Sequence, residues 1–258
     1  MEIEKKLSQY LFFDIETCRK TNYIHDLDDR EYYNILYKNR NKIESTTGLL
    51  SKLALDEYKA VEIYADMTDK ESLNQKQELY EAYGSFYPEF SRVICCGLGA
   101  YTPNGEERTN IISLSNSENE KDMLRKIADI FTKAEKSGKI LAGWNIKNFD
   151  IPFLVKRMII NEIEVPNNLR MYDKKPWDVK LLELTEIWSS NKFGDYSTLD
   201  SASSALGLET SKNGLVNGMN VAEVFYSGHG ITPIDEYCLR DVKITMEVAK
   251  KITPYILF

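Results

Sequence analysis

Three short stretches of the chain carry acids at spacings that could bind metal ions. Asp14 and Glu16 follow an apolar stretch, and Asp150 ends the sequence Asn-Ile-Lys-Asn-Phe-Asp. Tyr237 and Asp241 lie four residues apart near the C-terminal end. Hard divalent cations prefer carboxylate oxygens, and a pair of ions about 4 Å apart supports hydrolysis of a phosphodiester. We therefore expect the four acids to hold two divalent cations, Mg²⁺ or Mn²⁺, in a nuclease site.

Each stretch taken alone also has an ordinary explanation. Asp14 and Glu16 could be a solvated strand end, and Asp150, which precedes Ile and Pro, could cap a helix. Tyr237 and Asp241 would share one face of a helix, and such pairs are usually exposed to solvent. The combination favours a metal site, because acids that emerge from a buried strand need compensating charge.

The first pair of acids belongs to a run that predicts a buried strand. Residues 10–15 are rich in aromatic and aliphatic side chains, and they are followed directly by Glu16. Side chains two residues apart on a strand point the same way, so Asp14 and Glu16 would share one face.

Residues 19–89 differ in kind from the rest of the chain. They are rich in Lys, Glu, Asp, Asn and Tyr, and their pattern predicts several amphipathic helices, for example over 57–65 and 70–83. We expect a single catalytic domain over residues 1–258, in which residues 19–89 form a mainly helical insertion after the first strand.

Regular core elements resume after residue 90 and predict a mixed α/β sheet flanked by helices. The turn at residues 102–105 lies between two apolar runs and indicates a hairpin. Gly97 and Gly99 look like the start of a dinucleotide-binding loop, but Thr102 stands where the third glycine is needed. The expected strands cover 92–101, 109–114 and 139–144, and the expected helices cover 118–136, the residues from 150 onward, 179–188, 198–206, 221–226 and 232–251.

The composition is that of an ordinary globular protein. Hydrophobic residues make up 43% of the chain, no apolar run reaches the roughly 18 residues of a bilayer span, and the charged N-terminus lacks the apolar stretch of a signal peptide. The four cysteines have no CxxC spacing, which argues against a zinc site. We expect a cytoplasmic protein with no membrane contact. The net charge of -7 counts against extensive nucleic-acid binding but not against a metal-dependent site.

The three acidic stretches together resemble the exonuclease motifs of the DEDD (DnaQ-like) superfamily, in its tyrosine-bearing branch. The matching sequences are Asp14-Ile15-Glu16, the stretch 145–150 and Tyr237-Cys238-Leu239-Arg240-Asp241. The chain looks most like the proofreading exonuclease domains of family-B DNA polymerases and the stand-alone polymerase-B-like predicted 3′-to-5′ exonucleases. The resemblance covers about residues 7–17 and 90–252, including the loop at Lys212 to Gly214, and it leaves the segment between without a counterpart.

The resemblance implies an RNase H-like fold with the site at the first strand. It further implies that Asp14 bridges two metal ions, that Glu16 and Asp241 bind the tighter one, and that Asp150 holds the second. The four acids fit magnesium well.

The same resemblance assigns positioning roles to three other residues. Tyr237 would orient the attacking water, Thr17 would place its backbone near the terminal 3′-hydroxyl, and Asn145 would lie close to the scissile bond. Only His25 and His229 are present, and neither takes the place of Tyr237, so the histidine-bearing branch is the poorer match.

Residues near the second motif are candidates for contacts with the substrate. Phe149 and Trp144 could stack on bases of a single strand, and Lys147 could contact a phosphate. Packing and a solvated face are the alternatives for the aromatic and basic side chains, respectively. The other candidate stacking residues are Tyr172, Trp177, Phe193 and Tyr196.

These observations favour a metal-dependent 3′-to-5′ exonuclease that acts on single-stranded or frayed DNA ends in proofreading, replication or repair. Such an enzyme could work alone or beside a separate replication protein, with the insertion as a docking element. Two alternatives remain open: an exoribonuclease with the same chemistry, because no residue can be shown to read a 2′-hydroxyl, and a catalytically silent nucleic-acid-binding module.

Overall fold

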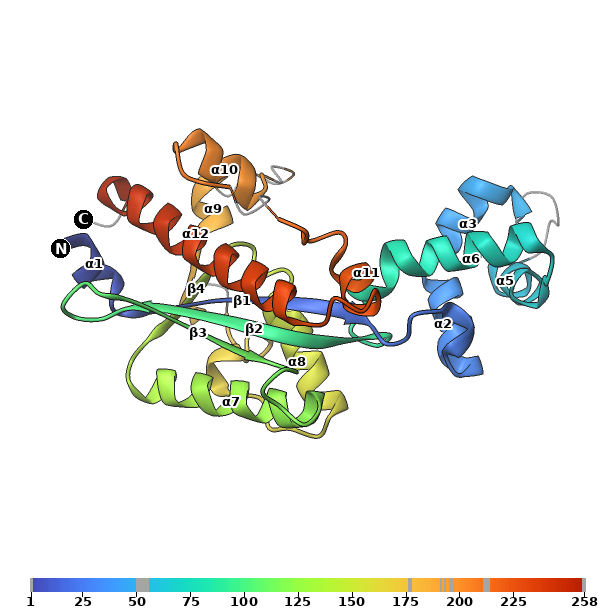
Figure 1. The fold of residues 1–258 in the computed structure, drawn as a ribbon, viewed down its shortest axis with the longest axis horizontal. Coiled ribbons are helices and arrows are strands. Elements are labelled where there is room, and N and C mark those ends of the chain that lie inside the picture. The colour runs from blue at the N-terminus through green and yellow to red at the C-terminus, as the bar shows by residue number, and fades with distance from the viewer. Residues whose placement is uncertain are drawn as a thin grey trace. The chain divides into compact units, whose positions relative to one another are not determined.

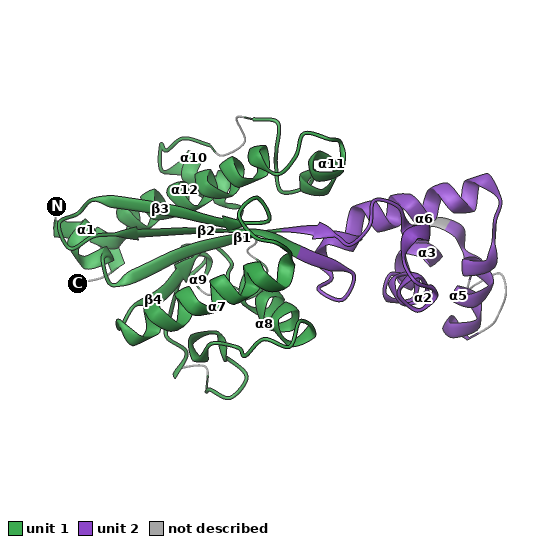
Figure 2. Ribbon diagram, turned by 60° about the horizontal axis from the view of Figure 1, so that its bottom comes forward, with its two compact units in different colours: residues 1–16, 93–258 green, residues 17–92 purple. Residues whose placement is uncertain are grey.

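The computed structural model describes residues 2–49, 56–175, 178–190, 192, 194, 197–210 and 214–256. The chain divides into two compact units (Figure 2). The first unit comprises Met1–Glu16 and Val93–Phe258, and the second comprises Thr17–Arg92. The insertion expected at residues 19–89 falls within the second unit, and its role within a single catalytic domain stays a prediction.

A mixed sheet of five strands, in the order β3-β2-β1-β4-β5, forms the centre of the first unit. β1 is parallel to β4 and β4 is parallel to β5, whereas β2 and β3 are antiparallel. The mixed α/β sheet and the hairpin are therefore confirmed. The strands are β1 (Tyr10–Arg19), β2 (Ser91–Tyr101), β3 (Glu107–Ser113), β4 (Ile140–Gly143) and β5 (Leu181–Glu183).

Helices cover both faces of this sheet, with α7 and α8 on one face and the long α12 on the other (Figure 1). Alternate residues of β1 point to the two layers. Phe13 belongs to the apolar cluster that includes residues of α7 and α8, whereas Phe12 belongs to the cluster that includes residues of α12. The helices of the first unit are α1 (Glu2–Leu7), α7 (Glu120–Lys136), α8 (Asp150–Ile160), α9 (Leu184–Trp188), α10 (Leu199–Ala205), α11 (Val221–Tyr226) and α12 (Thr232–Ile256).

Two glycines of β2 allow α12 to lie close to the sheet. A Cβ atom on Gly97 would lie 2.9 Å from Val242 Cγ2 and 3.0 Å from Cys238 Sγ, and a Cβ on Gly99 would lie 2.6 Å from Val242 Cγ1. These distances are too short for real side-chain contacts. The glycine pair that looks like a dinucleotide loop in the sequence therefore serves helix packing.

One expected element was wrong. Residues 179–188 were expected to form a single helix, but Leu181–Glu183 forms β5 and only Leu184–Trp188 is helical as α9. Leu181 and Leu182 pair with Leu141 and Ala142 of β4, and this long-range parallel pairing decides the conformation of a short apolar run.

The second unit is a helical segment that follows the first strand, as expected, and it has its own apolar cluster, which includes Ile35, Leu36 and Tyr80. Its helices α2, α5 and α6 each begin after an aspartate whose carboxylate accepts a backbone N–H three residues later. The helices are α2 (Asp29–Lys38), α3 (Arg40–Thr47), α5 (Glu57–Asp66) and α6 (Lys70–Tyr83). Among the described residues, none of the helices combines the length and apolar character that a bilayer span requires.

Candidate active site

The side chains of Asp14 and Glu16 emerge on the face of β1 that carries α12. Leu11, Phe13 and Ile15 all belong to the cluster on the opposite face, so the alternation of the strand sends Asp14 and Glu16 toward α12. Glu16 is only 7% exposed and Asp14 is half-buried. A strand that is buried on both sides thus carries one buried and one half-buried acid on the same face.

Helix α12 brings Tyr237 and Asp241 to the same region. The two residues are one turn apart, and the Asp241 carboxylate raises the pKa of the Tyr237 hydroxyl. The charges of Asp241, Glu16 and Asp14 all act on the Tyr237 hydroxyl, which places the phenol among the acids.

Asp150 completes the group from a third part of the chain. Its Oδ1 accepts the backbone N–H of Ile15 at 3.0 Å, and the residue is 3% exposed. Asp150 is the first residue of α8, after Phe149 at the N-cap, which makes no side-chain capping bond. The carboxylate is therefore directed to β1, where it bonds to the backbone of the residue between the two acids of that strand.

Burial and neighbouring acids oppose the charged forms of Asp14 and Glu16. Burial raises the pKa of Asp14 well above its usual range, and the charges of Asp150, Glu16 and Asp241 raise it further. Burial, followed by the charges of Asp241 and Asp150, likewise raises the pKa of Glu16. Burial raises the pKa of Asp150 to about 7 against the hydrogen bond from Ile15, which lowers it. A divalent cation would offset this repulsion, and the oxygen ligands suit Mg²⁺ or Mn²⁺.

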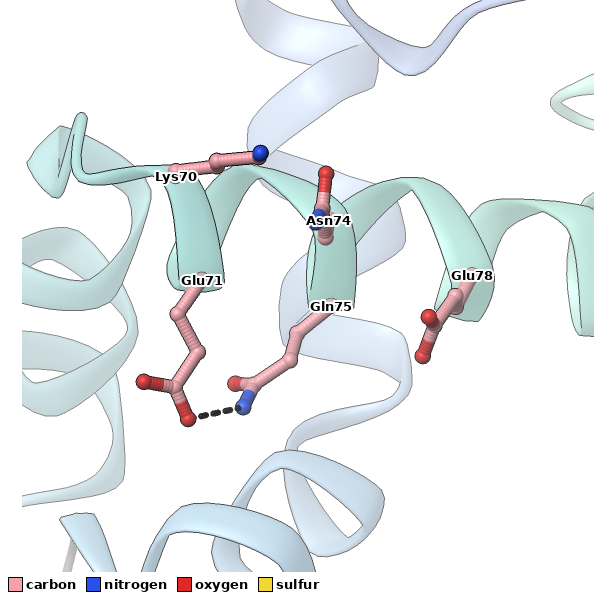
Figure 3. A pocket seen from close by; sticks show the side chains of 5 residues that line it. All are labelled: Lys70, Glu71, Asn74, Gln75 and Glu78. Carbon is pink, nitrogen blue, oxygen red and sulfur yellow. Dashed lines mark hydrogen bonds between the residues drawn. The ribbon is translucent and has the colours of Figure 1, made fainter.

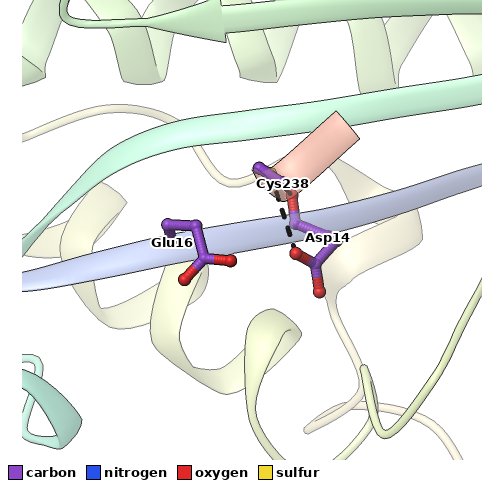
Figure 4. A group of neighbouring side chains, drawn as sticks. All are labelled: Asp14, Glu16 and Cys238. Carbon is purple, nitrogen blue, oxygen red and sulfur yellow. Dashed lines mark hydrogen bonds between the residues drawn. The ribbon is translucent and has the colours of Figure 1, made fainter. Parts of the chain in front are cut away.

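Cys238 is a neighbour of the acids that the sequence analysis did not single out. Its thiol accepts the backbone N–H of Gly97 at 3.2 Å and lies 3.6 Å from Asp14 Oδ2, to which it donates (Figure 4). One ligand atom from each of Asp14, Glu16 and Cys238 lies within 4.8 Å of the others. The position directly after Tyr237, on the sheet-facing side of a helix, was the available signal.

Glu183 was also missed, although it shapes the second motif. The residue is 4% exposed, and its carboxylate accepts the backbone N–H groups of Asn145 at 2.7 Å and Lys147 at 2.8 Å. The signal in the sequence was an acid directly after the apolar pair Leu181 and Leu182, which repeats the pattern of Asp14 after its own apolar run.

The candidate substrate-binding residues have local partners of their own. Asn145 has a left-handed backbone (φ 62°), and its Oδ1 accepts the Asn148 amide at 3.0 Å. Lys147 Nζ forms an ion pair with Glu186 at 2.5 Å. Thr17 is the first residue of the second unit, and its hydroxyl donates to the Ser85 carbonyl at 2.9 Å.

The aromatic candidates are divided between packing and exposure. Phe149 and Trp144 are partly buried against the two apolar clusters of the first unit, and the Phe149 ring centroid lies 5.5 Å from that of Phe153. Tyr172 is 72% exposed and stays available for a base. Trp177, Phe193 and Tyr196 lie outside the described residues. The same holds for Lys212 and Asn213, which belong to the loop that the family resemblance includes.

A separate hollow in the second unit is unrelated to the acids. It is an open depression whose walls are polar side chains of one helix, α6, and Gln75 Nε2 donates to Glu71 Oε1 across it at 3.4 Å (Figure 3). Its lining residues are Lys70, Glu71, Asn74, Gln75 and Glu78. A shallow surface on a single helix does not bring separate chain segments together, as the acidic group does.

Comparisons with known proteins agree with the motifs. The model of a family described as "Predicted 3'-5' exonuclease related to the exonuclease domain of PolB" matches residues 85–251. A solved family B DNA polymerase from the hyperthermophilic archaeon Pyrobaculum calidifontis is 22% identical and superposes with a TM-score of 0.51, over 68% of this chain and 23% of the polymerase chain.

The structural likeness confirms the RNase H-like fold that the resemblance implied. The chain corresponds to less than a quarter of the polymerase's length, so the likeness concerns one part of that protein. Among curated proteins no sequence matches. The family match covers more than half of the chain, and the chain therefore belongs to the predicted 3′-to-5′ exonucleases related to the exonuclease domain of PolB.

Proposed function

We propose that this protein removes nucleotides one at a time from the 3′ end of single-stranded or frayed DNA, in a reaction that needs two divalent cations. One observation carries the proposal: acids from three distant parts of the chain meet in one largely buried group, in which the charges of Asp150 and Asp241 raise the pKa of both Asp14 and Glu16. Such a group costs stability without a cation, and structures retain costly charges chiefly at functional sites.

The donor set fits two hard cations. Asp14, Glu16 and Asp241 would hold one ion, and Asp14 together with Asp150 would hold the other. The bound ions would supply a nucleophile at neutral pH and stabilise charge on the phosphate. The thiol of Cys238 is a soft donor and is better suited to orienting Asp14, with which it forms a hydrogen bond.

Tyr237 would position the attacking water. Burial and the nearby acids raise the pKa of its hydroxyl above the ordinary value of a phenol, so the group stays protonated at neutral pH. A protonated phenol has oxygen lone pairs that can accept a hydrogen bond from water. Its role would be orientation rather than proton abstraction.

The substrate contacts are proposed from the resemblance. Asn145 would lie near the scissile bond and Thr17, which follows Glu16 in the chain, would face the 3′-hydroxyl with its backbone. Phe149 and Trp144 would stack on bases of the substrate. Lys147 would bind a phosphate of the substrate in place of Glu186, with which it forms an ion pair. Action in proofreading or repair beside a replication protein, with the segment 19–89 as the docking element, belongs to the same proposal.

The proposal is tested by digestion of a 5′-labelled single-stranded DNA with Mg²⁺ or Mn²⁺. The wild-type protein is compared with Asp14→Ala, with an EDTA control, and with Asp129→Ala, which removes an exposed acid of α7. We expect a ladder that shortens from the 3′ end with the wild type and Asp129→Ala, and none with Asp14→Ala or EDTA.

A matched RNA strand, digested in parallel, separates the two substrates. Faster digestion of RNA than of DNA would show that RNA is the preferred substrate, hydrolysed by the same chemistry. Intact DNA and RNA, with folded wild-type protein and either metal ion, would overturn the exonuclease and favour a silent binding module.

A further inference from the structure

We infer that Glu183, a buried acid outside the group of four, is a positioning residue that fixes Asp150 at the site by holding the loop of residues 144–149. The inference rests on the proposed function, because it concerns the acid that would hold the second cation. It assigns a task to a residue that lies outside the three acidic stretches.

Glu183 lies where two parallel strands end. It is the last residue of β5, and its register partner is Gly143, the last residue of β4. The loop that leads to Asp150 starts directly after Gly143. The Glu183 side chain therefore meets this loop at its first residues.

The side-chain hydrogen bonds described for Glu183 are made to this loop and to the start of α9. One oxygen accepts the N–H of Asn145 at 2.7 Å and the N–H and hydroxyl of Thr185 at 3.2 and 2.5 Å. The other oxygen accepts the N–H of Lys147 at 2.8 Å. Four donors satisfy the hydrogen-bonding capacity of this buried carboxylate, and they occupy the oxygens that a metal ion would need.

The loop needs such an anchor because its backbone is unusual. Asn145 adopts φ 62°, a left-handed conformation that non-glycine residues adopt at a cost. The N–H groups of residues 145 and 147 converge on one carboxylate, an arrangement that commonly binds an anion. Glu183 supplies this anion from within the chain and so stabilises the turn.

The same turn leads without interruption into the acid of the site. The N–H of Phe149 donates to the carbonyl of Asn145 at 3.2 Å, and the N–H of Ile151 to that of Ile146 at 2.9 Å. Asp150 then accepts the N–H of Ile15 on β1 at 3.0 Å. The loop is thus attached at its start by Glu183 and at its end by the bond between Asp150 and β1.

The test is Glu183→Gln, which keeps the size of the side chain but turns one acceptor into an N–H₂ group facing a backbone donor. We expect the Mg²⁺ concentration for half-maximal digestion to rise about tenfold, in the range seen when residues that orient metal ligands are replaced. KM for DNA should change less than twofold. Calorimetric titration with Mn²⁺ should show two bound ions in the wild type and one tight ion in the variant.

The matched control is Glu120→Gln. Glu120 is also a mostly buried carboxylate that accepts a backbone N–H, that of Val93 at 3.0 Å, and it pairs with Arg157 at 2.5 Å; neither partner belongs to the loop. It should lose thermal stability and keep the wild-type Mg²⁺ dependence. Glu183→Asp keeps the charge but is one methylene shorter. If Glu183→Gln does not fold, the Mg²⁺ dependence and the number of bound Mn²⁺ ions are measured on Glu183→Asp instead.

The outcomes separate this inference from the proposed function. A wild-type protein without metal-dependent digestion would overturn both. An active wild type whose folded Glu183 variants keep the Mg²⁺ dependence and the two Mn²⁺ ions would overturn the positioning role alone. A tenfold rise in the Mg²⁺ concentration for half-maximal digestion in Glu120→Gln as well would show that general destabilisation causes the effect. That result would also overturn the positioning role of Glu183.

Discussion

Asp150 and Ile15 are joined by a hydrogen bond of 3.0 Å between the aspartate Oδ1 and the isoleucine N–H. Ile15 is the residue between Asp14 and Glu16, so the bond fixes the third acid beside the first two. The bond favours the charged form of Asp150, whereas burial opposes it more strongly, and the pKa rises to about 7. The group is therefore held in place by geometry while its charge is poorly compensated.

Replacing Asp150 should raise the stability of the metal-free protein and lower its activity. Asp150→Asn keeps an oxygen that can accept the Ile15 N–H, and it removes a charge that repels Asp14 and Glu16. We expect the metal-free protein at pH 8 to gain about 0.5–2 kcal/mol in free energy of unfolding, as is common when a strained site is relieved. Digestion of DNA should fall at least about 100-fold. Urea unfolding in EDTA and the digestion assay measure the two effects, and a metal-free variant less stable than the wild type would contradict the prediction.

The stability of the metal-free protein should decrease as the pH rises from about 4 to about 7. The folded pKa of Asp150 is raised from 3.8 to about 7, so the folded state binds more protons than the unfolded state between these values. Its contribution is complete below the unfolded pKa and is lost as the pH passes the folded one, at most about 4 kcal/mol. Raised pKa values of Asp14 and Glu16 act in the same direction.

Magnesium should reverse this loss, because a cation competes with protons for the same carboxylates. Thermal unfolding measured at pH 5 and pH 8, in EDTA and in Mg²⁺, should show a larger stabilisation by the metal at pH 8. Equal stabilisation at both pH values, or a metal-free stability that rises through this window, would show that the acids do not titrate together in the way the structure implies.

Tyr237→Phe should slow catalysis without weakening metal binding. The variant keeps the buried ring and loses the hydroxyl on which the charge of Asp241 acts. We expect kcat to fall about 10- to 100-fold, because a misplaced nucleophile is costly, while the Mg²⁺ concentration for half-maximal rate stays within twofold. Ionisation of this phenol should cause no change in the wild-type rate between pH 7 and 9. Tyr101→Phe, another buried tyrosine, is the control, and an unchanged kcat in Tyr237→Phe would remove the orienting role.

The sequence predicted the fold class, which the structure confirms, and it singled out four acids and Tyr237 as a site, which stays a prediction; both rest on short motifs and on period-2 alternation, which are local properties. It did not predict β5, because the conformation of Leu181 and Leu182 depends on pairing with β4, forty residues away in the chain. Glu183 and Cys238 were missed for the same reason: their partners, the N–H groups of the 145–147 turn and the Asp14 carboxylate, come from distant segments.

Gly97→Ala should damage the site through α12 rather than through any ligand. The added Cβ would lie 2.9 Å from Val242 Cγ2 and 3.2 Å from the Cys238 carbonyl, and a backbone atom cannot turn aside as a flexible side chain can. The helix must move away from β2, which should cost about 1–3 kcal/mol in free energy of unfolding. Because Tyr237 and Asp241 lie on this helix, kcat should also fall, by about 10-fold or more.

Gly218→Ala serves as the comparison for this prediction. Its Cβ would lie 3.7 Å from the Tyr237 hydroxyl, an ordinary contact distance. We expect it to keep stability within about 0.5 kcal/mol and the rate within threefold. Thermal unfolding and single-turnover digestion of both variants measure the contrast. If Gly97→Ala keeps the wild-type rate and stability, α12 does not need its close approach to β2, and the placement of Tyr237 and Asp241 must depend on other contacts.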